Sequence, residues 1–202
     1  GIARWDGVAW QPMGGGAVIG EFLTFVEFEG DLIAGGTFRL TDDPSIWYVA
    51  RWDGSAWQAM GHRFNNMVTS LVVYQGELLV GGSFTNAGLS APGRVAKWSG
   101  SEWDAFEVAP TPAIPVGLFS VRGQLYRSAT FFDPATGHHA LARWEGVAWV
   151  PADRGDLSEV HAMADFREEI YTGAFDTRPS WSVRRWDGLR WQNVGRGMTA
   201  PV

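Results

Sequence analysis

The chain has 202 residues, of which 46% are hydrophobic, so it is long and apolar enough to bury a sizeable core. Its formal net charge is −6 with no block of like charges, and we expect neither nucleic acid nor an anionic membrane as a partner. The absence of cysteine excludes a disulfide framework and thiolate metal sites, and no apolar run reaches the ~20 residues of a membrane span. Because no Met-initiated leader precedes Gly1, we expect a piece of a longer protein.

A short motif with two tryptophans recurs from one end of the chain to the other. It begins as ARWDGVAW at residues 3–10 and returns as ARWDGSAW, AKWSGSEW, ARWEGVAW and RRWDGLRW. The basic residues before the first tryptophan, spaced by 47, 46, 46 and 42 positions, are Arg4, Arg51, Lys97, Arg143 and Arg185. Self-similarity at this period predicts an array of repeats of about 45 residues.

Between the tryptophan motifs lies a second recurring pattern, in which two short apolar runs flank a tight turn. It reads VEFEGDLIAGGTF from residue 26, VYQGELLVGGSF from 73, SVRGQLYRSATF from 120 and ADFREEIYTGAF from 164. The turn contains glycine in the first three copies and Arg167-Glu168 in the fourth. Together with the tryptophan hairpin this predicts four antiparallel strands per repeat, and no segment has a sustained helical period.

Four antiparallel strands every ~45 residues are the sequence signature of a propeller blade, so we predict an all-β protein, a β-propeller of four-stranded antiparallel blades. The chain would form a single β-propeller domain, or a propeller fragment, with four complete repeats and one partial blade. The partial blade spans residues 1–14, the repeats span about 18–61, 67–107, 114–152 and 159–195, and a further strand starts at 198–202.

We interpret the tryptophan motif as a packing device. If the Asp-Gly pair forms a two-residue turn, Trp52 lies opposite Ser55, Ala50 lies opposite Trp57, and the two indoles lie diagonally on one face. Such a turn needs positive φ at its glycine, and glycine stands there in every copy, at positions 7, 54, 100, 146 and 188. We expect neighbouring blades to cover these indoles, because exposing them all as sugar-stacking platforms would leave a large apolar surface.

The order of these features resembles kelch-type propeller repeats. IAGGTF followed by ARWDGSAW, and VGGSFTNAG followed by VAKWSGSEW, combine an apolar strand, a glycine pair and a tryptophan hairpin. They look closest to repeat arrays of large secreted bacterial proteins that are similar to the fungal cortical cell-polarity marker repeat. The resemblance covers essentially the whole chain and implies a propeller fold and a secreted or cell-surface location, but no particular reaction.

The catalytic residues of known propeller enzymes are incomplete in this sequence. A copper-radical oxidase of the galactose oxidase type needs a tyrosine–cysteine cofactor, which a chain without cysteine cannot form. A sialidase needs an arginine cluster, an acid and a tyrosine nucleophile, whereas the tyrosines, at 48, 74, 126 and 171, fall in predicted strands or at their starts. We therefore predict no catalytic residue, no cofactor and no metal site.

Binding residues are expected on the segments that differ between copies. These join the second and third strands of a repeat, or one repeat to the next, and strand direction puts both sets on one face. Trp47 and Trp181, which lie outside the tryptophan motif, are our candidates for ligand-stacking aromatics, although they could instead extend the third strand into the core. The other candidate ligand-binding residues, all on predicted loops, are Asp133, His138, His139, Arg154 and Asp156.

Two of these loops have alternative interpretations. Asp133 and His139 could hold a metal ion, but adjacent histidines on a loop are more typical of a solvated segment. Arg154-Gly155-Asp156 matches the integrin-binding tripeptide, yet the composition alone predicts about 0.1 copies by chance.

The sequence thus predicts a non-catalytic propeller scaffold or binding module of a larger secreted or cell-surface protein, with a protein or glycan ligand on its variable loop face. The alternative is a carbohydrate-active enzyme, glycosidase or sialidase-like. The predicted strands number eighteen, or nineteen if residues 199–202 pair, which is too few for five complete blades and leaves an open edge. We expect further repeats, or self-association with a second copy, to close the ring.

Overall fold

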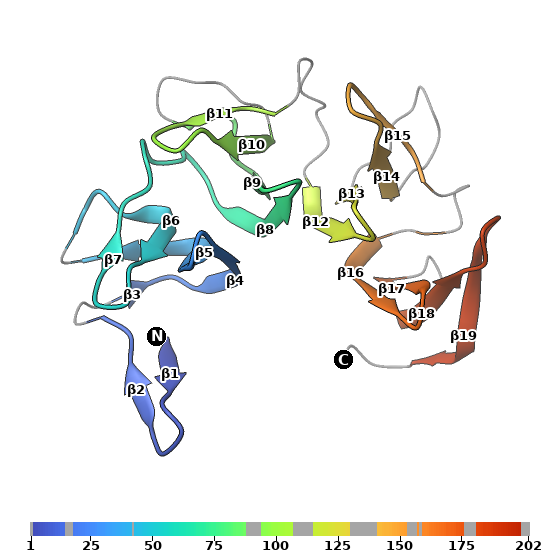
Figure 1. Cartoon of the computed structure of the whole chain (residues 1–202), viewed down its shortest axis with the longest axis horizontal. Helices are drawn as coiled ribbons and strands as arrows, with labels where there is room; N and C mark the ends of the chain where they lie inside the picture. Colours follow the sequence, from blue (N-terminus) through green and yellow to red (C-terminus); the bar gives the residue numbers. More distant parts are fainter. Residues whose placement is uncertain are drawn as a thin grey trace. The chain divides into compact units, whose positions relative to one another are not determined.

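The computed structural model describes residues 2–14, 18–41, 43–87, 94–106, 115–129, 141–152, 157, 159–175 and 181–198 (Figure 1). Within these ranges it contains 19 β-strands and no helix, so the all-β class predicted from the sequence is confirmed. None of the described residues forms a helix able to cross a membrane. The chain divides into two compact units, Gly1–Pro110 (unit 1) and Thr111–Val202 (unit 2).

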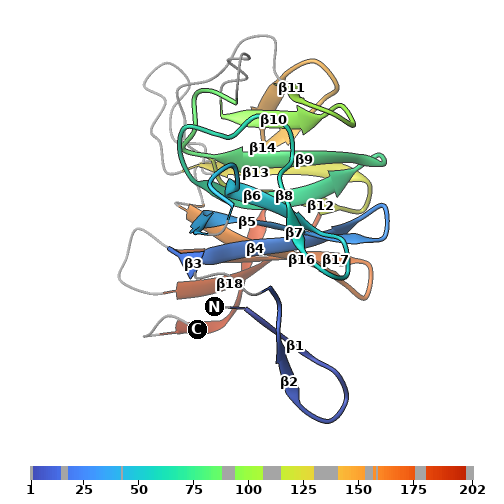
Figure 2. The same cartoon turned by 90° about the vertical axis from the view of Figure 1, so that its left-hand side faces the viewer.

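Unit 1 contains a hairpin and two antiparallel sheets. The hairpin joins β1 (Ala3–Trp5) to β2 (Trp10–Pro12), and Figure 2 shows it at the edge of the unit, beyond β4. The first sheet consists of β3 (Val18–Ile19), β4 (Phe22–Phe28), β5 (Asp31–Leu40), β6 (Trp47–Trp52) and β7 (Trp57–Gln58). The second sheet consists of β8 (Val68–Tyr74), β9 (Glu77–Gly82), β10 (Val95–Trp98) and β11 (Trp103–Ala105).

The first sheet has a fifth strand because the opening strand of its repeat is bent in two. β3 and β4 both pair with β5, and Gly20 between them has a φ of +92°. A Cβ added to Gly20 would lie 2.6 Å from the carbonyl oxygen of Thr37, so only glycine fits this bend. Apart from the bend, the sheet keeps the predicted order of four strand positions.

Unit 2 contains two four-stranded antiparallel sheets in chain order. The first consists of β12 (Pro115–Val121), β13 (Gln124–Ala129), β14 (Leu141–Trp144) and β15 (Trp149–Pro151). The second consists of β16 (Glu159–Phe166), β17 (Glu169–Phe175), β18 (Trp181–Trp186) and β19 (Trp191–Met198). These meanders confirm the predicted four-stranded sheets and are consistent with propeller blades. Met198, predicted to open a new strand, instead ends β19, and residues 199–202 lie outside the described residues.

The tryptophan hairpins differ from the predicted register. Trp52 pairs directly with Trp57 and not with Ser55, so the turn has four residues rather than two. The two-residue prediction was wrong because the aspartate side chain stabilises the wider turn: Asp53 Oδ1 accepts the backbone N–H groups of Ser55 and Ala56, both at 2.9 Å. Direct pairing brings the two rings to within 5.0–5.7 Å in all five motifs. The turn glycines have positive φ, as predicted.

Asp187 makes the same contacts in the last tryptophan hairpin. Its Oδ1 accepts the N–H groups of Leu189 at 2.8 Å and Arg190 at 2.9 Å, and its Oδ2 accepts Nε2 of Gln192 at 2.6 Å. All three hydrogen bonds favour the ionised form of the carboxyl over the protonated form, and the bond from Gln192 contributes most to the pKa shift. They lower the pKa of the Asp187 carboxyl from 3.8 to about 2.

We expect this turn to lose stabilisation in acid. The pKa of Asp187 is lower in the folded state than in the unfolded state. The contribution of its hydrogen bonds to folding stability is therefore complete above the unfolded pKa of 3.8 and disappears as the pH falls through about 2. An NMR titration of the Asp187 carboxyl carbon should give a midpoint near 2. Asp187→Asn keeps a hydrogen-bond acceptor but cannot ionise. In this variant the amide chemical shift of Leu189 should no longer change as the pH is lowered through the acid range. A midpoint near 3.8 would contradict the hydrogen-bonded turn.

A hydrogen bond from the second tryptophan of a motif joins consecutive sheets within each unit. The acceptor is always the backbone carbonyl of the third residue after the second tryptophan of the preceding motif. The donor–acceptor pairs, with N···O distances of 3.1, 2.9 and 3.2 Å, are Trp57–Met13, Trp103–Met60 and Trp191–Ala152. The motif therefore packs each of these repeats on the one before it.

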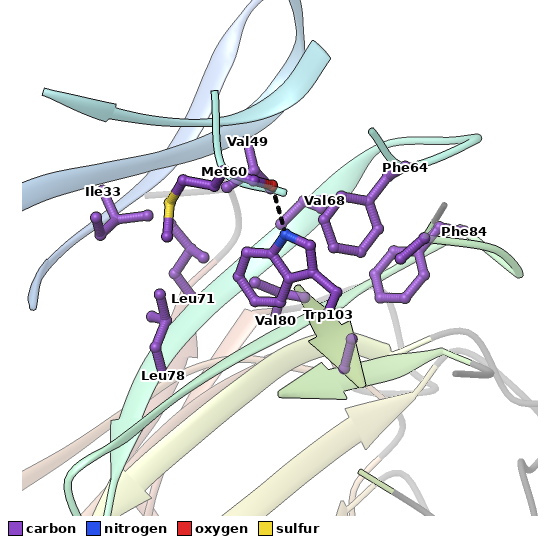
Figure 3. Packing of buried hydrophobic residues seen from close by; sticks show 12 residues of the cluster. Ile33, Val49, Met60, Phe64, Val68, Leu71, Leu78, Val80, Phe84 and Trp103 are labelled. Carbon is purple, nitrogen blue, oxygen red and sulfur yellow. Dashed lines mark hydrogen bonds between the residues drawn. The ribbon is translucent and has the colours of Figure 1, made fainter. Parts of the chain in front are cut away.

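Trp103 shows how a motif tryptophan packs between two consecutive sheets of unit 1 (Figure 3). Its side chain is 1% exposed, its ring lies 5.2 Å from that of Phe64, and its Nε1 points at the carbonyl of Met60. The same cluster combines residues of the first sheet, such as Ile33, with residues of the second, such as Leu78. The core of unit 1 thus lies between consecutive sheets.

Burial of the tryptophans follows from the presence of a preceding repeat. The predicted burial is confirmed for Trp57, Trp103 and Trp191, which are 8%, 1% and 6% exposed. It is wrong for Trp5 and Trp10, which are 50% and 69% exposed and pack on no preceding repeat among the described residues.

Candidate ligand-binding site

In unit 1 the two kinds of variable segment meet, as the sequence predicted. Asn65 follows β7 and accepts at Oδ1 the backbone N–H groups of Thr85, at 3.0 Å, and Asn86, at 3.1 Å, which follow β9. Phe64 also forms a β-bridge with Ala87. These bonds hold the segments after β7 and after β9 together, on what we call the loop side.

Trp47 begins β6, and its own segment fixes its position. Its indole Nε1 donates to the carbonyl oxygen of Pro44 at 2.9 Å. Asp43 in the same segment accepts both the backbone N–H and the hydroxyl of Ser45, at 2.9 and 2.6 Å, and these bonds lower the pKa of the Asp43 carboxyl. The indole is half-buried and already has its hydrogen bond, so it offers a ligand only its apolar surface.

A β-bulge brings Arg39 opposite Trp47. The ladder passes from the pair Gly35–Val49 to the pair Arg39–Trp47, so β5 advances by four residues while β6 advances by two. Tyr48, at this step, has a φ of +67°, which is uncommon for an aromatic residue. Among the described residues it is the one non-glycine at positive φ outside the two-residue turns, so backbone strain is concentrated beside Trp47.

Two arginines stack on the indole of Trp47. The guanidinium carbon of Arg39 lies 5.5 Å from the centre of the indole, and that of Arg63, from the segment after β7, lies 5.2 Å away. Both distances are within the range of a cation–π interaction. We call Arg39, Trp47 and Arg63 the arginine–tryptophan site; it joins residues from two variable segments on the loop side.

The two guanidinium groups keep their charges available. Neither Arg39 nor Arg63 forms a salt bridge within the part of the chain that the structure describes, and both side chains are exposed. Arg51 and Arg185, in contrast, lie 3.6 and 3.0 Å from carboxylate oxygens. The site therefore concentrates positive charge on a protein whose net charge is −6.

The structure places one of the predicted binding residues in this site. Trp47 is a member, and Trp181 occupies the equivalent position at the start of β18, paired through its backbone with Phe175 and Met198. The remaining predicted residues lie outside the described residues: Asp133, His138, His139, Arg154 and Asp156.

Sequence reasoning missed Arg39 and Arg63. Arg39 follows the glycine pair of β5 in GGTFRL, and Arg63 lies in GHRFNN, so both fall in segments that vary between copies. Their shared contact with Trp47 depends on the bulge in β5, which leaves no residue pattern of its own. Variation between copies was the one signal that pointed to them.

Outside the arginine–tryptophan site, His62 and Glu102 form a structural pair. His62 Nδ1 lies 2.8 Å from Glu102 Oε2, and this hydrogen bond lowers the pKa of the Glu102 carboxyl. The described residues include no group of three His, Asp or Glu side chains placed to hold a metal ion. A groove of about 520 Å³ between the hairpin β1–β2 and the first sheet is lined by turn residues such as Gly30 and Gly54, away from the loop side.

Comparisons with known proteins identify no family. No family model matches the chain, and no curated protein matches it. A solved structure, that of the computationally designed Ika8 protein, is similar over 88% of this chain, with a TM-score of 0.45 and 12% identity. The chain spans about half the length of that protein, covering 48% of it.

Proposed function

We propose that the chain is a non-catalytic β-propeller binding module of the kelch-like type, part of a larger secreted or cell-surface protein, and that it binds an acidic glycan on its loop side. One observation carries the proposal: two exposed guanidinium groups, which have no carboxylate partner among the described residues, are stacked on the half-buried indole of Trp47. Holding two like charges beside one ring costs electrostatic energy, which a bound anion would offset.

The chemistry of the site defines the ligand. A guanidinium group presents a planar fork of N–H donors that matches a carboxylate or a sulfate, often through two hydrogen bonds. The indole of Trp47 contributes an apolar surface, because its N–H is bound to Pro44. A ligand that combines an apolar ring face with an acidic substituent fits both requirements, and uronic and sulfated sugars have this character.

Carboxyl chemistry favours a binding module over a glycosidase. A glycosidase needs a carboxyl that stays protonated, with a raised pKa, near a second carboxylate. In the described part of the chain every carboxyl with a resolved shift has a lowered pKa and accepts hydrogen bonds within a turn or loop contact: Asp6, Asp43, Asp53, Glu102 and Asp187. Such groups are poor proton donors at neutral pH.

We expect the protein to retain sulfated or uronate-containing glycans on a glycan array and to release neutral ones. Arg39→Gln and Arg63→Gln each remove a charge-assisted contact and should weaken binding by about tenfold or more. Arg51→Gln is the matched control, because Arg51 lies in the same sheet but faces Asp31. Separate sulfated and uronate ligands distinguish the two sources of negative charge.

Three results would contradict the proposal. If the Arg39→Gln, Arg63→Gln double variant bound acidic glycans as tightly as the wild type, the binding site would lie elsewhere. Capture of acidic proteins with no glycan retained would make the ligand a protein. Turnover of a chromogenic glycoside would favour the alternative, a carbohydrate-active enzyme.

A further inference from the structure

A cavity of about 300 Å³ lies between the two four-stranded sheets of unit 2. Its apolar wall comes from the last sheet, where Ile170, Trp186 and Trp191 line it. The rings of Trp186 and Trp191 are 5.2 Å apart, and Trp191 is 6% exposed. Leu189, which is 72% exposed on the turn between these tryptophans, also lines the cavity and marks its opening to solvent. We call this space the interblade cavity.

The interblade cavity lies where the third repeat has a small residue. Ala152 lines it and is the third residue after the second tryptophan of its motif. The residues at that place in the other motifs are larger: Met13, Met60, Phe106 and Val194. In unit 1, Met60 is 6% exposed and lies in one buried cluster with Trp103 of the following repeat (Figure 3). Ala152 keeps the backbone contact, because its carbonyl accepts the indole N–H of Trp191 at 3.2 Å, but its side chain does not fill the space between the sheets.

Two polar side chains line the cavity from the sheet β12–β15. Tyr126 and Arg143 are direct partners in the ladder between β13 and β14, so their side chains lie on the same face of this sheet. Tyr126 is 9% exposed, and its hydroxyl has no hydrogen-bond partner among the described residues. Burial raises the pKa of this hydroxyl, so it stays protonated at neutral pH. A buried donor without an acceptor is costly, and an acceptor on a ligand would satisfy it.

The third repeat also lacks a carboxylate that accompanies the basic residue of the motif in other repeats. That carboxylate lies on the preceding strand, in the pairs Arg51–Asp31, Lys97–Glu77 and Arg185–Glu169. In the third repeat its place is taken by Gln124, which is uncharged and donates to the carbonyl of Trp144. Arg143 pairs instead with Glu145 of its own turn, and both side chains are about half exposed, so this pair is weak. A guanidinium has five N–H donors, so a ligand carboxylate can share Arg143 with Glu145.

We infer that the interblade cavity binds a small aromatic carboxylic acid, at a second site separate from the arginine–tryptophan site. The ring of the ligand packs on Trp186 and Trp191, and its carboxylate accepts hydrogen bonds from Tyr126 and Arg143. A cavity of about 150 Å³ admits benzene, so the ~300 Å³ between these sheets accommodates two fused rings. An apolar ring alone would match the tryptophan wall but would leave both donors without an acceptor.

The probe for this site is 2-naphthoate, followed through the indole N–H signals in a two-dimensional ¹H–¹⁵N NMR titration of the whole chain. We expect a saturable shift of the Trp191 signal with a Kd of about 0.1–1 mM, as suits a ligand of this size. The alcohol 2-naphthalenemethanol has the same rings without the charge. It should bind about tenfold more weakly, because hydrogen bonds to a charged group are the stronger ones.

Ala152→Met tests the cavity without removing any contact. It supplies the side chain that Met60 supplies in unit 1, and should weaken 2-naphthoate binding by about tenfold or more. Val147→Met is the matched control, because Val147 is 83% exposed on the turn of the same motif and should keep the wild-type Kd.

Two further variants test the polar wall. Tyr126→Phe removes one neutral donor and should weaken binding about threefold, and Arg143→Gln should weaken it about tenfold. Arg51→Gln changes the equivalent residue of unit 1 and should have no effect. Because these side chains lie at the margin of the core, they keep the test valid if Ala152→Met fails to fold, which circular dichroism reports.

Four outcomes would overturn the inference. The first is no saturable shift of the Trp191 signal up to about 5 mM 2-naphthoate, well above the expected Kd. The second is wild-type affinity in a folded Ala152→Met variant, and the third is equal binding of the alcohol and the acid. The fourth is loss of 2-naphthoate binding in the Arg39→Gln, Arg63→Gln double variant, which would place this ligand in the arginine–tryptophan site. Acidic glycans should bind Ala152→Met as they bind the wild type, so the two sites can fail independently.

Discussion

Replacing Trp103 by alanine should lower the free energy of unfolding by about 3–5 kcal/mol, the range observed for removing a large buried aromatic side chain. The indole is 1% exposed and packs on Phe64, and its N–H is bound to the carbonyl of Met60 at 2.9 Å. Alanine would leave a cavity between two sheets and a buried carbonyl without its donor. Chemical denaturation followed by circular dichroism measures the loss.

Trp10→Ala provides the comparison for this experiment. Trp10 has the same place in its motif as Trp103 but is 69% exposed, so its removal should cost less than about 1 kcal/mol in the monomer. A similar loss in both variants would contradict the conclusion that the preceding repeat determines burial. A loss below about 1 kcal/mol for Trp103→Ala would show that the indole is not a core residue.

Gly82→Ala should be the second most damaging of these substitutions, with a loss of about 3 kcal/mol. A Cβ at this position would lie 2.2 Å from the backbone carbonyl oxygen of Met67, the residue immediately before the neighbouring strand β8. A backbone atom cannot rotate away as a side chain can, so β8 and β9 would have to separate. The midpoint of thermal or chemical unfolding reports the effect.

Gly173→Ala is the control for the glycine pair. In the fourth repeat the atom nearest to an added Cβ at Gly173 is the Cβ of Ala162, at an ordinary contact distance of 3.7 Å. This substitution should change the stability by about 0.5 kcal/mol or less. Alanine already stands at 174, the position equivalent to Gly82, and is 1% exposed there. Equal losses at Gly82 and Gly173 would show that the steric explanation is wrong.

The four-stranded sheets could be predicted because their signals are local and repeated. Both residues of a two-residue turn such as Glu29-Gly30 have positive φ, and the glycine marks the turn in the sequence. The short apolar runs on either side of it form the strands. The register of the tryptophan hairpin could not be predicted, because residue type alone does not reveal that Asp53 bonds two backbone N–H groups and widens the turn. A side-chain hydrogen bond there overrode the usual preference for a two-residue Asp-Gly turn.

The candidate site was predictable only in part, for a related reason. Trp47 could be identified as a tryptophan outside the repeated motif, in a segment that varies between copies. Its partners Arg39 and Arg63 come from two other segments, and a bulge and a loop-to-loop contact bring them to it. Burial of the motif tryptophans likewise depends on a neighbouring repeat, which is why Trp10 and Trp57 differ in exposure although each is the second tryptophan of a motif that begins ARWDG.

Indole N–H signals in a two-dimensional ¹H–¹⁵N NMR spectrum test the proposed binding site most directly. The probe is an acidic oligosaccharide, added as a galacturonate trimer or as a sulfated hexasaccharide, with a neutral oligosaccharide as the control. Our account predicts that the acidic probe shifts the signal of Trp47, leaves those of Trp57 and Trp103 unchanged, and loses its effect in the Arg39→Gln, Arg63→Gln double variant. An unchanged Trp47 signal, with shifts confined to other tryptophans, would contradict it.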